Sequence, residues 1–418
     1  MSSSKTQSLL AKLHHGVRSV IAPPQKGSAP SDSEVSVEEQ ERNALIRLYE
    51  RTGGTGWKRD DGWMSERPVK YWYGVQTEAG TVAEIDLAAN RLRGDLPSEI
   101  GCLSFLTKLD LGGNALEGSL PPAIGELTSL THLDMGGNNL TGPIHSSLGR
   151  LTSLDYLSLR GNKLTGEIPR LLTALTALEH LDLACNRLTG TIPHKLDALS
   201  GLEHLDLGCN QIGGEIPPAI GSLGSLRRLH LEGNLLKGQI PDALGNLDAL
   251  EYLNLSANRL SSVMPATLGR VSRLEYLILS RNNLTGDIPY ELGRLACLRV
   301  LRLDDNALVG PRFPVLGELS SLECLDIGMN RLEGPLGAEL GNLSQIRFVD
   351  LKNNRLTGQV PARLIRLDRL EHLDLSRNQL TGPIPAELGS MPNLRFLDLS
   401  VNWLDGDPPG PRGGVIAK

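Results

Sequence analysis

The sequence predicts an α/β solenoid: one curved, right-handed stack of coils with a parallel β-sheet on the concave face and short 3-10 or irregular turns on the convex face. Two observations support this prediction. An asparagine recurs every 24 residues from Asn90 to Asn402, which gives fourteen copies of one unit. The copies share the pattern LxxLxLxxNxLxGxIPxxLGxL. A fixed period of this kind marks units that cannot bury their apolar faces alone and therefore stack on their neighbours.

Each copy combines a strand with a buried asparagine. The leucines before the asparagine, such as Leu109 and Leu111, alternate with polar residues, which is typical of a strand with one face inward. The chain must then turn inward, and an amide with donors and an acceptor can satisfy the unpaired peptide groups and link neighbouring coils. The predicted structural ladder comprises Asn90, Asn114, Asn138, Asn162, Asn186, Asn210, Asn234, Asn258, Asn282, Asn306, Asn330, Asn354, Asn378 and Asn402.

A glycine follows four residues after the asparagine in thirteen copies, and Ser262 takes its place in the other. This regularity predicts a positive φ or a close approach of the backbone. Three copies depart from the pattern in detail. The eighth copy has Ser262 and also Met264 in place of isoleucine, the tenth reads GPRFP with Pro314 one place late, and the eleventh has Gly337 where proline is usual.

The repeated unit resembles the plant-type leucine-rich repeat, with its GxIPxxLGxL convex half, over residues 81–404. The segment before it resembles the N-terminal cap of that family, which reads C-x-W-x-G-V-x-C, and also looks like caps in repeat proteins of algae, related protists and some bacteria. The aligned residues are Lys70, Trp72, Gly74, Val75 and Thr77, so both cap cysteines are replaced. The resemblance implies a binding module in signalling, recognition or defence.

The chain divides into four predicted segments. Residues 1–35 form a disordered tail, with an organelle transit peptide as the alternative because the segment is amphipathic, contains Arg and Ser, and has no acidic residue before Asp32. Residues 36–80 form the N-terminal cap, residues 81–404 the fourteen repeats, and residues 405–418 a short Pro/Gly-rich tail. The tail is too short to cap the last coil, so we expect that open end to pack on a partner or, by self-association, on a second copy of the chain.

Within the cap, a helix and a group of tryptophans are expected. The sequence from Ser36 to Glu39 fits a capping box, and the helix should run to about Arg51, where Gly53 and Gly54 end it. Three of the four tryptophans follow within a short stretch and should close the open end of the first coil, as terminal repeats require. These are Trp57, Trp63 and Trp72.

Composition and motifs exclude several classes of function. The net charge is −6 and no basic run occurs, so nothing indicates nucleic-acid binding. No apolar run approaches the ~20 residues of a membrane span. The sequence contains no GxxxxGK[ST], GxSxG or HExxH motif and no kinase motif set, so we predict a non-catalytic protein without a cofactor.

The five cysteines are odd in number and unclustered, which favours a reducing compartment. We therefore expect a cytoplasmic interaction scaffold in signalling that binds a protein or peptide ligand. An organelle is one alternative. The other is a secreted or cell-surface recognition protein, similar to a receptor ectodomain or an inhibitor of cell-wall-degrading enzymes. That alternative predicts glycans at the sequons Asn139, Asn254, Asn283 and Asn342.

The concave face has a repeated aspartate column, four residues before the asparagine, that is interrupted in repeats seven to ten. The aspartates themselves belong to the LDL phrase of the consensus. The interruption places mixed charge, two adjacent tyrosines and one exposed apolar residue together, and Tyr and Arg are favoured at binding hot spots. Drift on an unused surface is the alternative. The predicted ligand-binding patch comprises Arg228, His230, Glu232, Tyr252, Asn254, Tyr276, Ile278, Arg302 and Asp304.

A metal site is a further interpretation and would suit a metal-assisted enzyme. The side chains concerned are His180, Asp182, His204 and Asp206, with Cys185 and Cys209 nearby in sequence. The cysteines, however, lie roughly 15 Å from the histidines along an extended strand. The same HLD triplet recurs singly at His132 and His372. We therefore predict no metal and two free thiols.

Overall fold

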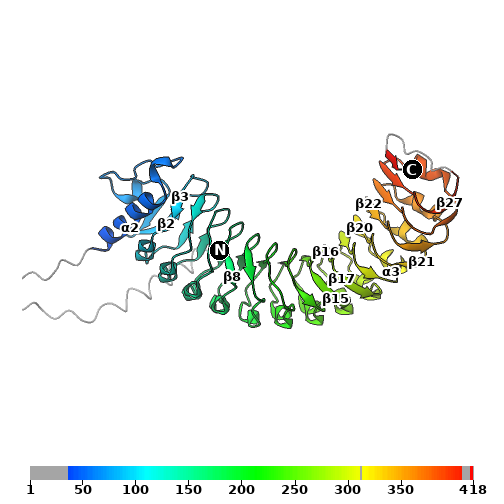
Figure 1. Cartoon of the computed structure of the whole chain (residues 1–418), viewed down its shortest axis with the longest axis horizontal. Coiled ribbons are helices and arrows are strands. Elements are labelled where there is room, and N and C mark those ends of the chain that lie inside the picture. The colour runs from blue at the N-terminus through cyan, green and yellow to red at the C-terminus, as the bar shows by residue number, and fades with distance from the viewer. Residues whose placement is uncertain (1–35, 311–312, 407–414, 418) are drawn as a thin grey trace, which may run out of the picture. The chain divides into compact units, whose positions relative to one another are not determined.

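The structure is a computed structural model that describes residues 36–310, 313–406 and 415–417. The expected tail or transit peptide of residues 1–35 lies outside the described residues. From Glu38 onward the described residues belong to one compact unit. In it, the coils stack side by side into a curved solenoid with the main sheet on the inner side and short helical turns on the outer side (Figure 1). The predicted solenoid fold is confirmed.

The chain enters the solenoid through helix α2 (Val37–Arg51), which is followed by Gly53 with φ 69°. The buried carboxylate of Glu41 accepts a hydrogen bond of 2.9 Å from the backbone N–H of Val82 and thereby ties the helix to the first coil. Behind the helix, the rings of Trp63, Trp57 and Trp72 lie together. Ring centroids of Trp57 and Trp63 are 4.8 Å apart, and those of Trp63 and Trp72 are 5.0 Å apart. All three rings join the apolar core that continues through the coils.

The main sheet has sixteen strands, of which β1 and β2 form an antiparallel hairpin and all later neighbours are parallel. From β2 to β26, each coil contributes one short strand, in register with its neighbours at a spacing of 24 residues. The strands, in sheet order, are β1 (Val75–Glu78), β2 (Thr81–Asp86), β4 (Lys108–Asp110), β6 (His132–Asp134), β7 (Tyr156–Ser158), β9 (His180–Asp182), β11 (His204–Asp206), β12 (Arg228–His230), β14 (Tyr252–Asn254), β16 (Tyr276–Ile278), β18 (Val300–Arg302), β20 (Cys324–Asp326), β22 (Phe348–Asp350), β24 (His372–Asp374), β26 (Phe396–Asp398) and β28 (Val415–Ala417).

A second set of short strands follows the asparagines and forms five small parallel sheets along the side of the solenoid. These strands pair because each coil repeats the path of the previous one. They are β3 (Arg93–Asp95), β5 (Ala115–Glu117), β8 (Thr165–Glu167), β10 (Arg187–Thr189), β13 (Lys237–Gly238), β15 (Arg259–Val263), β17 (Asn283–Gly286), β19 (Ala307–Leu308), β21 (Glu333–Pro335), β23 (Arg355–Thr357), β25 (Thr381–Pro383) and β27 (Trp403–Asp405).

The outer side of the curve carries 3-10 turns, most of them starting after the proline of the repeat, whose fixed φ suits a helix start. The turns are η1 (Gly54–Gly56), η2 (Val69–Tyr71), η3 (Ser98–Cys102), η4 (Pro122–Glu126), η5 (Ser146–Arg150), η6 (Arg170–Ala174), η7 (Leu196–Ala198), η8 (Pro218–Ser222), η9 (Asp242–Asn246), η10 (Ala266–Arg270), η11 (Tyr290–Arg294), η12 (Ala338–Asn342), η13 (Ala362–Arg366) and η14 (Ala386–Ser390). One coil has instead the α-helix α3 (Phe313–Leu316).

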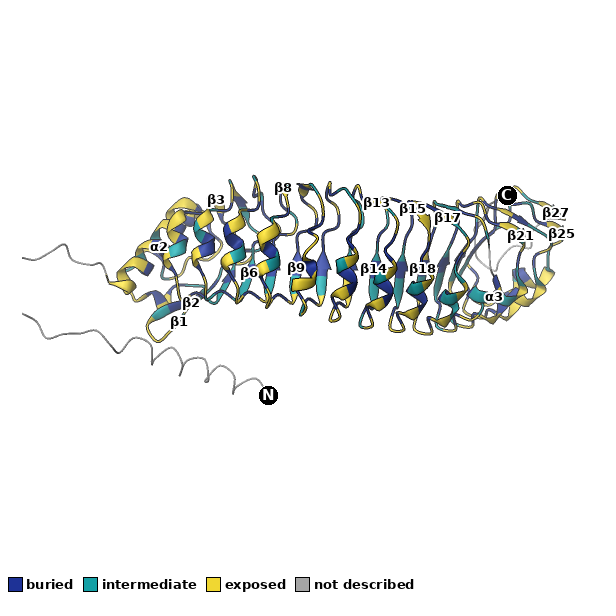
Figure 2. Ribbon diagram, turned by 90° about the horizontal axis from the view of Figure 1, so that it is seen from below, coloured by how far each residue is buried: buried dark blue, intermediate teal, exposed yellow. Residues whose placement is uncertain are grey.

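The core is a continuous column of leucines inside the coils. Strand leucines such as Leu109 and Leu111 have no exposed surface, and the same holds for most of their counterparts. In Figure 2 the buried residues lie inside each coil, while exposed residues follow the outer turns. Each buried leucine contributes about 2 kcal/mol of transfer free energy. The core energy is therefore spread evenly along the stack rather than concentrated in one place.

The repeated asparagines lie inside the coils and join each coil to the one before it. From Asn114 to Asn402, each amide nitrogen donates to the carbonyl 27 residues earlier, and each amide oxygen accepts from the N–H 22 residues earlier. Asn90 has no earlier coil and bonds instead with the backbone N–H and carbonyl of Arg59 in the cap segment.

The residue before every asparagine has a positive φ, a repeated feature that the sequence pattern does not reveal. Four of these fourteen residues are glycines and ten are not, among them Arg281, Met329 and the β-branched Val401. The left-handed region costs an L-residue about 1–2 kcal/mol. The asparagine bonds on either side hold the chain in this conformation even where no glycine is present.

The glycine four residues after the asparagine has the predicted positive φ in twelve of the thirteen copies that contain it. Ser262, which replaces the glycine, keeps the same conformation with φ 76°. Gly310 is the exception, since its φ lies outside the left-handed region. The expected backbone requirement therefore holds everywhere except in the irregular tenth copy.

The departures in the tenth and eleventh copies are one packing arrangement. In the tenth copy, Phe313 is buried and begins helix α3, which replaces the usual 3-10 turn. In the next coil, a Cβ on Gly337 would overlap the side chain of Phe313. Gly337 replaces proline because the phenylalanine of the previous coil occupies the space. These irregular residues lie in the core and on the outer turns, so they do not support a ligand site on the concave face.

The C-terminal tail was expected to leave the last coil uncovered, but part of it extends the main sheet. Val415–Ala417 forms strand β28, which pairs in parallel with β26. An edge strand presents unpaired N–H and carbonyl groups, and any extended segment that lies alongside can satisfy them. Composition gave no signal for this strand because backbone groups rather than side chains provide the pairing.

Candidate functional site

The predicted patch lies on four neighbouring strands, β12, β14, β16 and β18, of the main sheet. The register pairs Arg228 with Tyr252 and Tyr252 with Tyr276, and in the parallel column it pairs His230, Asn254, Ile278 and Arg302 in that order. A hollow of about 270 Å³ opens here, lined by Arg228, His230, Glu251, Tyr252, Glu275 and Tyr276. Four of the nine predicted residues line this hollow. Two further lining residues, Glu251 and Glu275, were not predicted from the sequence.

The remaining predicted residues lie outside the lining of this hollow, and some of their polar atoms already have hydrogen-bond partners within the chain. The amide oxygen of Asn254 accepts from the backbone N–H and the hydroxyl of Ser256, at 3.1 and 2.7 Å, so it is turned toward its own chain. Asp304 accepts a hydrogen bond from the hydroxyl of Ser280. Ile278 was expected to be exposed but is half-buried.

The hollow carries both signs of charge. Arg228 is exposed and forms no ion pair with any other residue that the structure describes. The two glutamates have partners outside the hollow, since Arg227 lies 3.2 Å from Glu251 and Arg299 lies 3.7 Å from Glu275. The guanidinium of Arg228 is therefore the charge best placed to meet an acidic group of a ligand, with the tyrosine rings beside it.

A ladder of stacked rings runs along the concave face into the hollow. Consecutive centroids are 4.3 to 5.5 Å apart, a spacing typical of stacked or tilted rings. In the column six residues before the asparagine, Arg228 interrupts the run of rings. The ring of His230, from the column four residues before the asparagine, lies between His204 and Tyr252 and continues the ladder. The ladder comprises His132, Tyr156, His180, His204, His230, Tyr252 and Tyr276.

This ladder was not predicted from the sequence, although most of its rings recur at one position of the repeat. Reading the column six residues before the asparagine over all repeats, rather than over the four central ones, would have shown the run of rings. A shorter ladder of Phe348, His372 and Phe396 has centroid distances of 4.3 and 4.2 Å. The recurring HLD triplet thus supplies rings for stacking.

Burial sets the protonation of the ladder histidines. Burial lowers the pKa of His204 to about 4, and the positive field of neighbouring side chains acts in the same direction. Burial also lowers the pKa of His180, against the opposing effect of Asp182. Both imidazoles are therefore neutral at pH 7, so these two stacked rings carry no charge of their own.

The aspartate column has a structural role at every one of its nine positions. Each carboxylate accepts a hydrogen bond from the backbone N–H two residues later, at 2.7 to 3.4 Å, and so stabilises the turn that follows the strand. The residues are Asp86, Asp110, Asp134, Asp182, Asp206, Asp326, Asp350, Asp374 and Asp398.

Asp326 is the most perturbed member of this column. Burial raises its pKa to about 7, and Asp304 and Asp350 act in the same direction, while Arg302 opposes them. A folded-state pKa above the unfolded value means that the folded protein loses stability as pH rises from about 4 to 7. We expect Asp326→Asn to raise the free energy of unfolding by about 2 kcal/mol at pH 8, with a smaller gain at pH 5.

Denaturant titrations at the two pH values measure this effect. Asp398→Asn is the matched control, because it occupies the same position in the last repeat with an aspartate on one side only, and it should change the free energy of unfolding less at pH 8. An equal gain for Asp326→Asn at pH 5 and pH 8 would contradict the assignment.

The four residues considered for a metal do not converge on one point. The rings of His180 and His204 stack face to face at 4.4 Å, and Arg160 lies 3.6 Å from Asp182 and 3.0 Å from Asp206. Cys185 and Cys209 are both exposed free thiols. Within the described part of the chain, two other groups bring three metal-ligating atoms within 4.8 Å of one another: Asp206, His230 and Glu232, and Asp350, His372 and Asp374.

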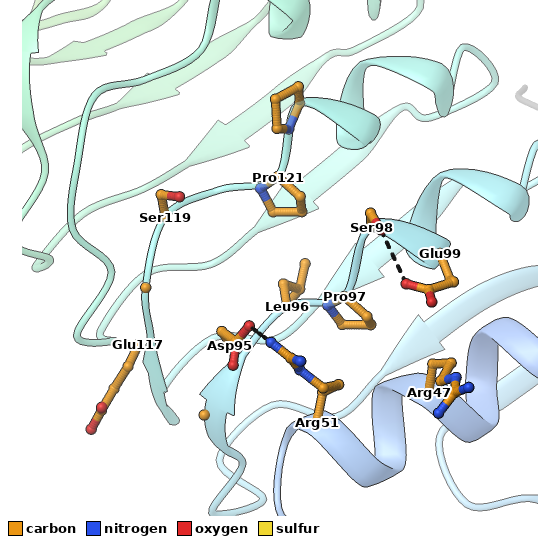
Figure 3. Close-up of a pocket in the computed structure, with 13 residues that line it drawn as sticks. Arg47, Arg51, Asp95, Leu96, Pro97, Ser98, Glu99, Glu117, Ser119 and Pro121 are labelled. Carbon is orange, nitrogen blue, oxygen red and sulfur yellow. Dashed lines mark hydrogen bonds and ion pairs between the residues drawn. The ribbon is translucent and has the colours of Figure 1, made fainter.

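A larger hollow, of about 810 Å³, lies where helix α2 meets the first two coils (Figure 3). Its arginines already have partners, since Arg51 forms an ion pair with Asp95 and Arg47 lies 2.8 Å from Glu50. The opposite wall is formed by turn residues such as Pro97 and Pro121. The hollow therefore offers neither an unpaired arginine nor an aromatic surface, and we do not assign a ligand to it.

Comparisons with known proteins agree with this architecture. The family model for the leucine rich repeat matches residues 176–236, 202–260 and 248–308, a leucine-rich repeat region model matches residues 86–190, and a further repeat model matches residues 369–391. Among curated proteins, no sequence matches the chain.

Several solved structures are similar. The ectodomain of the Arabidopsis thaliana receptor kinase GASSHO1/SCHENGEN3, in complex with CASPARIAN STRIP INTEGRITY FACTOR 2, is 36% identical with a TM-score of 0.69, over 78% of this chain and 42% of its own. The plant peptide hormone receptor RGFR1, in complex with RGF2, is 30% identical with a TM-score of 0.66, over 76% of this chain and 59% of its own. This chain thus spans about half the length of these two receptors.

A bacterial structure matches over more of its length. The Leptospira interrogans protein LIC12759 is 32% identical with a TM-score of 0.66, over 80% of this chain and 83% of its own. The chain therefore belongs to the leucine-rich repeat family. The similar structures include the ectodomain of a plant receptor kinase, a plant peptide hormone receptor and a bacterial leucine-rich repeat protein.

Proposed function

We propose that this protein is a non-catalytic recognition module that binds a protein or peptide ligand on its concave face, at the hollow between β12 and β16. The observation that carries the proposal is the free guanidinium of Arg228 beside the stacked rings of His230, Tyr252 and Tyr276. Aromatic and arginine side chains in a concavity are typical of binding hot spots. The similar plant receptors in complex with CASPARIAN STRIP INTEGRITY FACTOR 2 and RGF2 support this kind of ligand.

Removing both tyrosines of the hollow should weaken ligand binding. We expect Tyr252→Ala/Tyr276→Ala to lower the affinity roughly 30-fold or more, which corresponds to about 2 kcal/mol for the loss of a hot spot. The ligand is first identified by affinity capture from the protein's own cells with the wild-type chain, and its affinity is then measured by calorimetry with purified components.

Tyr290→Ala is the matched control, because Tyr290 is an exposed tyrosine on the outer turn η11. It should bind like the wild type. Unchanged affinity in the double variant would remove the hollow from the ligand site, and the same loss in Tyr290→Ala would move the site to the convex face.

We also propose a cytoplasmic scaffold role in signalling, with an organelle or a secreted recognition protein as the competing assignments. The five free thiols, of which four are exposed, support a reducing compartment. In the described part of the chain, none of the helices is long and apolar enough to cross a bilayer. The intact mass of the protein from its own cells tests the compartment. The unmodified 45.1 kDa supports the cytoplasm, loss of about 30 residues supports organelle import, and added hexose supports secretion.

The plant-type subclass and the cap likeness are part of the proposal. The 24-residue spacing and the identity of 36% to the GASSHO1/SCHENGEN3 ectodomain support the subclass. In the cap, a Cβ on Gly74 would collide with the backbone of Asp86, which explains why glycine is needed after Trp72. Self-association through the C-terminal end also remains a proposal, and light scattering that shows a monomer at high concentration would count against it.

A further inference from the structure

We propose that Asp206, His230 and Glu232 form a binding site for a divalent transition-metal ion, with Zn²⁺ as the ion that fits best. Their ligating atoms all lie within 4.8 Å of one another. One imidazole nitrogen and two carboxylate oxygens suit Zn²⁺, which binds such atoms at about 2.0–2.2 Å. Small side-chain rotations would bring the three atoms to these distances. The site shares His230 with the ligand hollow proposed above, and its test measures metal binding in the absence of that ligand.

The sheet itself brings the three residues together. Asp206 and His230 are directly paired at the ends of β11 and β12. Glu232 follows His230 by two residues and therefore lies on the same face of the sheet. Its side chain folds back over Gly208 of the previous coil, where a Cβ would be only 2.8 Å from Glu232 Oε1. The absence of a side chain at position 208 thus gives Glu232 room to reach toward Asp206.

One ligating atom of the group lacks a partner. Glu232 Oε2 is buried and has no hydrogen bond from any residue that the structure describes. His230 Nδ1 lies 3.7 Å from this oxygen, which is too long for a hydrogen bond. A buried carboxylate oxygen without a partner is unfavourable, and a bound cation would supply the missing interaction.

The charges around the three residues are more negative than positive, which favours a bound cation. The side chain of Asp206 is only 7% exposed, and its Oδ2 accepts from Arg160 at 3.0 Å. Arg160 is shared with Asp182 at 3.6 Å, so one guanidinium serves two carboxylates. It is also half-exposed and can therefore swing toward solvent. Arg160 forms its ion pairs with the two aspartates and not with Glu232, so a divalent ion would add a direct partner for that carboxylate.

The second group, Asp350, His372 and Asp374, has a closer built-in cation. Lys352 Nζ lies 2.7 Å from Asp350 Oδ2, whereas the guanidinium beside Asp206 lies at 3.0 Å and is shared with Asp182. Asp374 Oδ1 accepts from both the backbone N–H and the hydroxyl of Ser376. This group is a natural control, because it offers the same three kinds of ligand atom with a cation built in.

Zinc binding is measured on the full chain, purified with a chelator, dialysed against ZnCl₂ and analysed for metal content and by calorimetry. The expected result is one Zn²⁺ per chain for the wild type. Glu232→Gln, which keeps the side-chain shape, should bind at least about tenfold more weakly. Gly208→Ala should also weaken binding, because the new methyl group displaces Glu232 while the backbone φ at position 208 suits alanine.

Two control variants decide where a bound ion sits. His372→Gln should retain full binding, and so should Cys185→Ser/Cys209→Ser, which removes the two thiols nearest in sequence. Circular dichroism confirms that each variant is folded. A wild type that binds no Zn²⁺ overturns the proposal. So does full binding by Glu232→Gln, or loss of binding in either control, which would assign the ion to the second group or to the thiols.

Discussion

Replacing Asn282 with alanine is expected to lower the free energy of unfolding by about 3 kcal/mol. The amide nitrogen of Asn282 donates to the carbonyls of Leu255, Leu279 and Ser280 at 3.0 to 3.2 Å, and its oxygen accepts from the N–H of Leu260 at 3.0 Å. Alanine leaves these backbone groups without that partner inside two coils. Each unsatisfied buried group costs about 1–3 kcal/mol, and partial relaxation of the turn limits the sum.

Asn283→Ala provides the control for this measurement. Asn283 is the next residue and has the same chemistry, but it is exposed on strand β17. Denaturant unfolding followed by circular dichroism should show a change within about 0.5 kcal/mol for this variant. If Asn282→Ala were as mild as Asn283→Ala, the ladder would not stabilise the stack, and strand pairing alone would have to hold the coils together.

Trp72→Ala is expected to be the most damaging substitution in the cap, with a loss of about 3–5 kcal/mol. The ring is 2% exposed, contacts Trp63 and lies under the guanidinium of Arg42 at 5.1 Å. Its indole nitrogen has no hydrogen-bond partner among the described residues, unlike those of Trp57 and Trp63. Trp72→Phe should therefore cost only about 1 kcal/mol, because lost volume is offset by removal of an unsatisfied N–H.

Thermal unfolding and hydrogen exchange measure these two variants. Exchange in Trp72→Ala should rise most in the first coils, since repeat stability depends on nearest neighbours. Trp403→Ala is the control, because Trp403 is 66% exposed in the last coil and should change stability little. Equal losses of stability in Trp72→Ala and Trp72→Phe would contradict this expectation. They would show that the indole N–H stabilises the folded state through a hydrogen bond to a partner such as water.

Much of the fold could be predicted from the sequence because the repeat is so regular. The leucines around Leu109, the ladder position of Asn114 and the glycine at Gly118 each recur at one spacing, so one copy specifies all the others. Helix α2 could also be predicted from the sequence, since a capping sequence begins it and Gly53 follows it. Local chemistry and period are sufficient for such features.

The features that sequence analysis missed depend on contacts between coils. The left-handed residue before each asparagine is invisible because Arg281 or Val401 occupies it as readily as glycine. The link between Phe313 and Gly337 is a packing relation across neighbouring coils. In the candidate site, the columns gave Tyr252 and Tyr276 correctly as neighbours. The columns could not show that the ring of His230 lies between His204 and Tyr252 in the ring ladder, because that position depends on side-chain orientation.

The asparagine ladder gives the stack a direction. Each asparagine binds groups of its own coil and of the preceding coil, as Asn282 does with Leu255 and Leu260. A coil added at the C-terminal side finds these groups already presented, so tandem duplication can lengthen the chain there. The N-terminal side is different, because Asn90 depends on the backbone of Arg59. Growth of such a protein during evolution is therefore easier at the C-terminal side. At the N-terminal side, the first coil must keep the cap segment that bonds with Asn90.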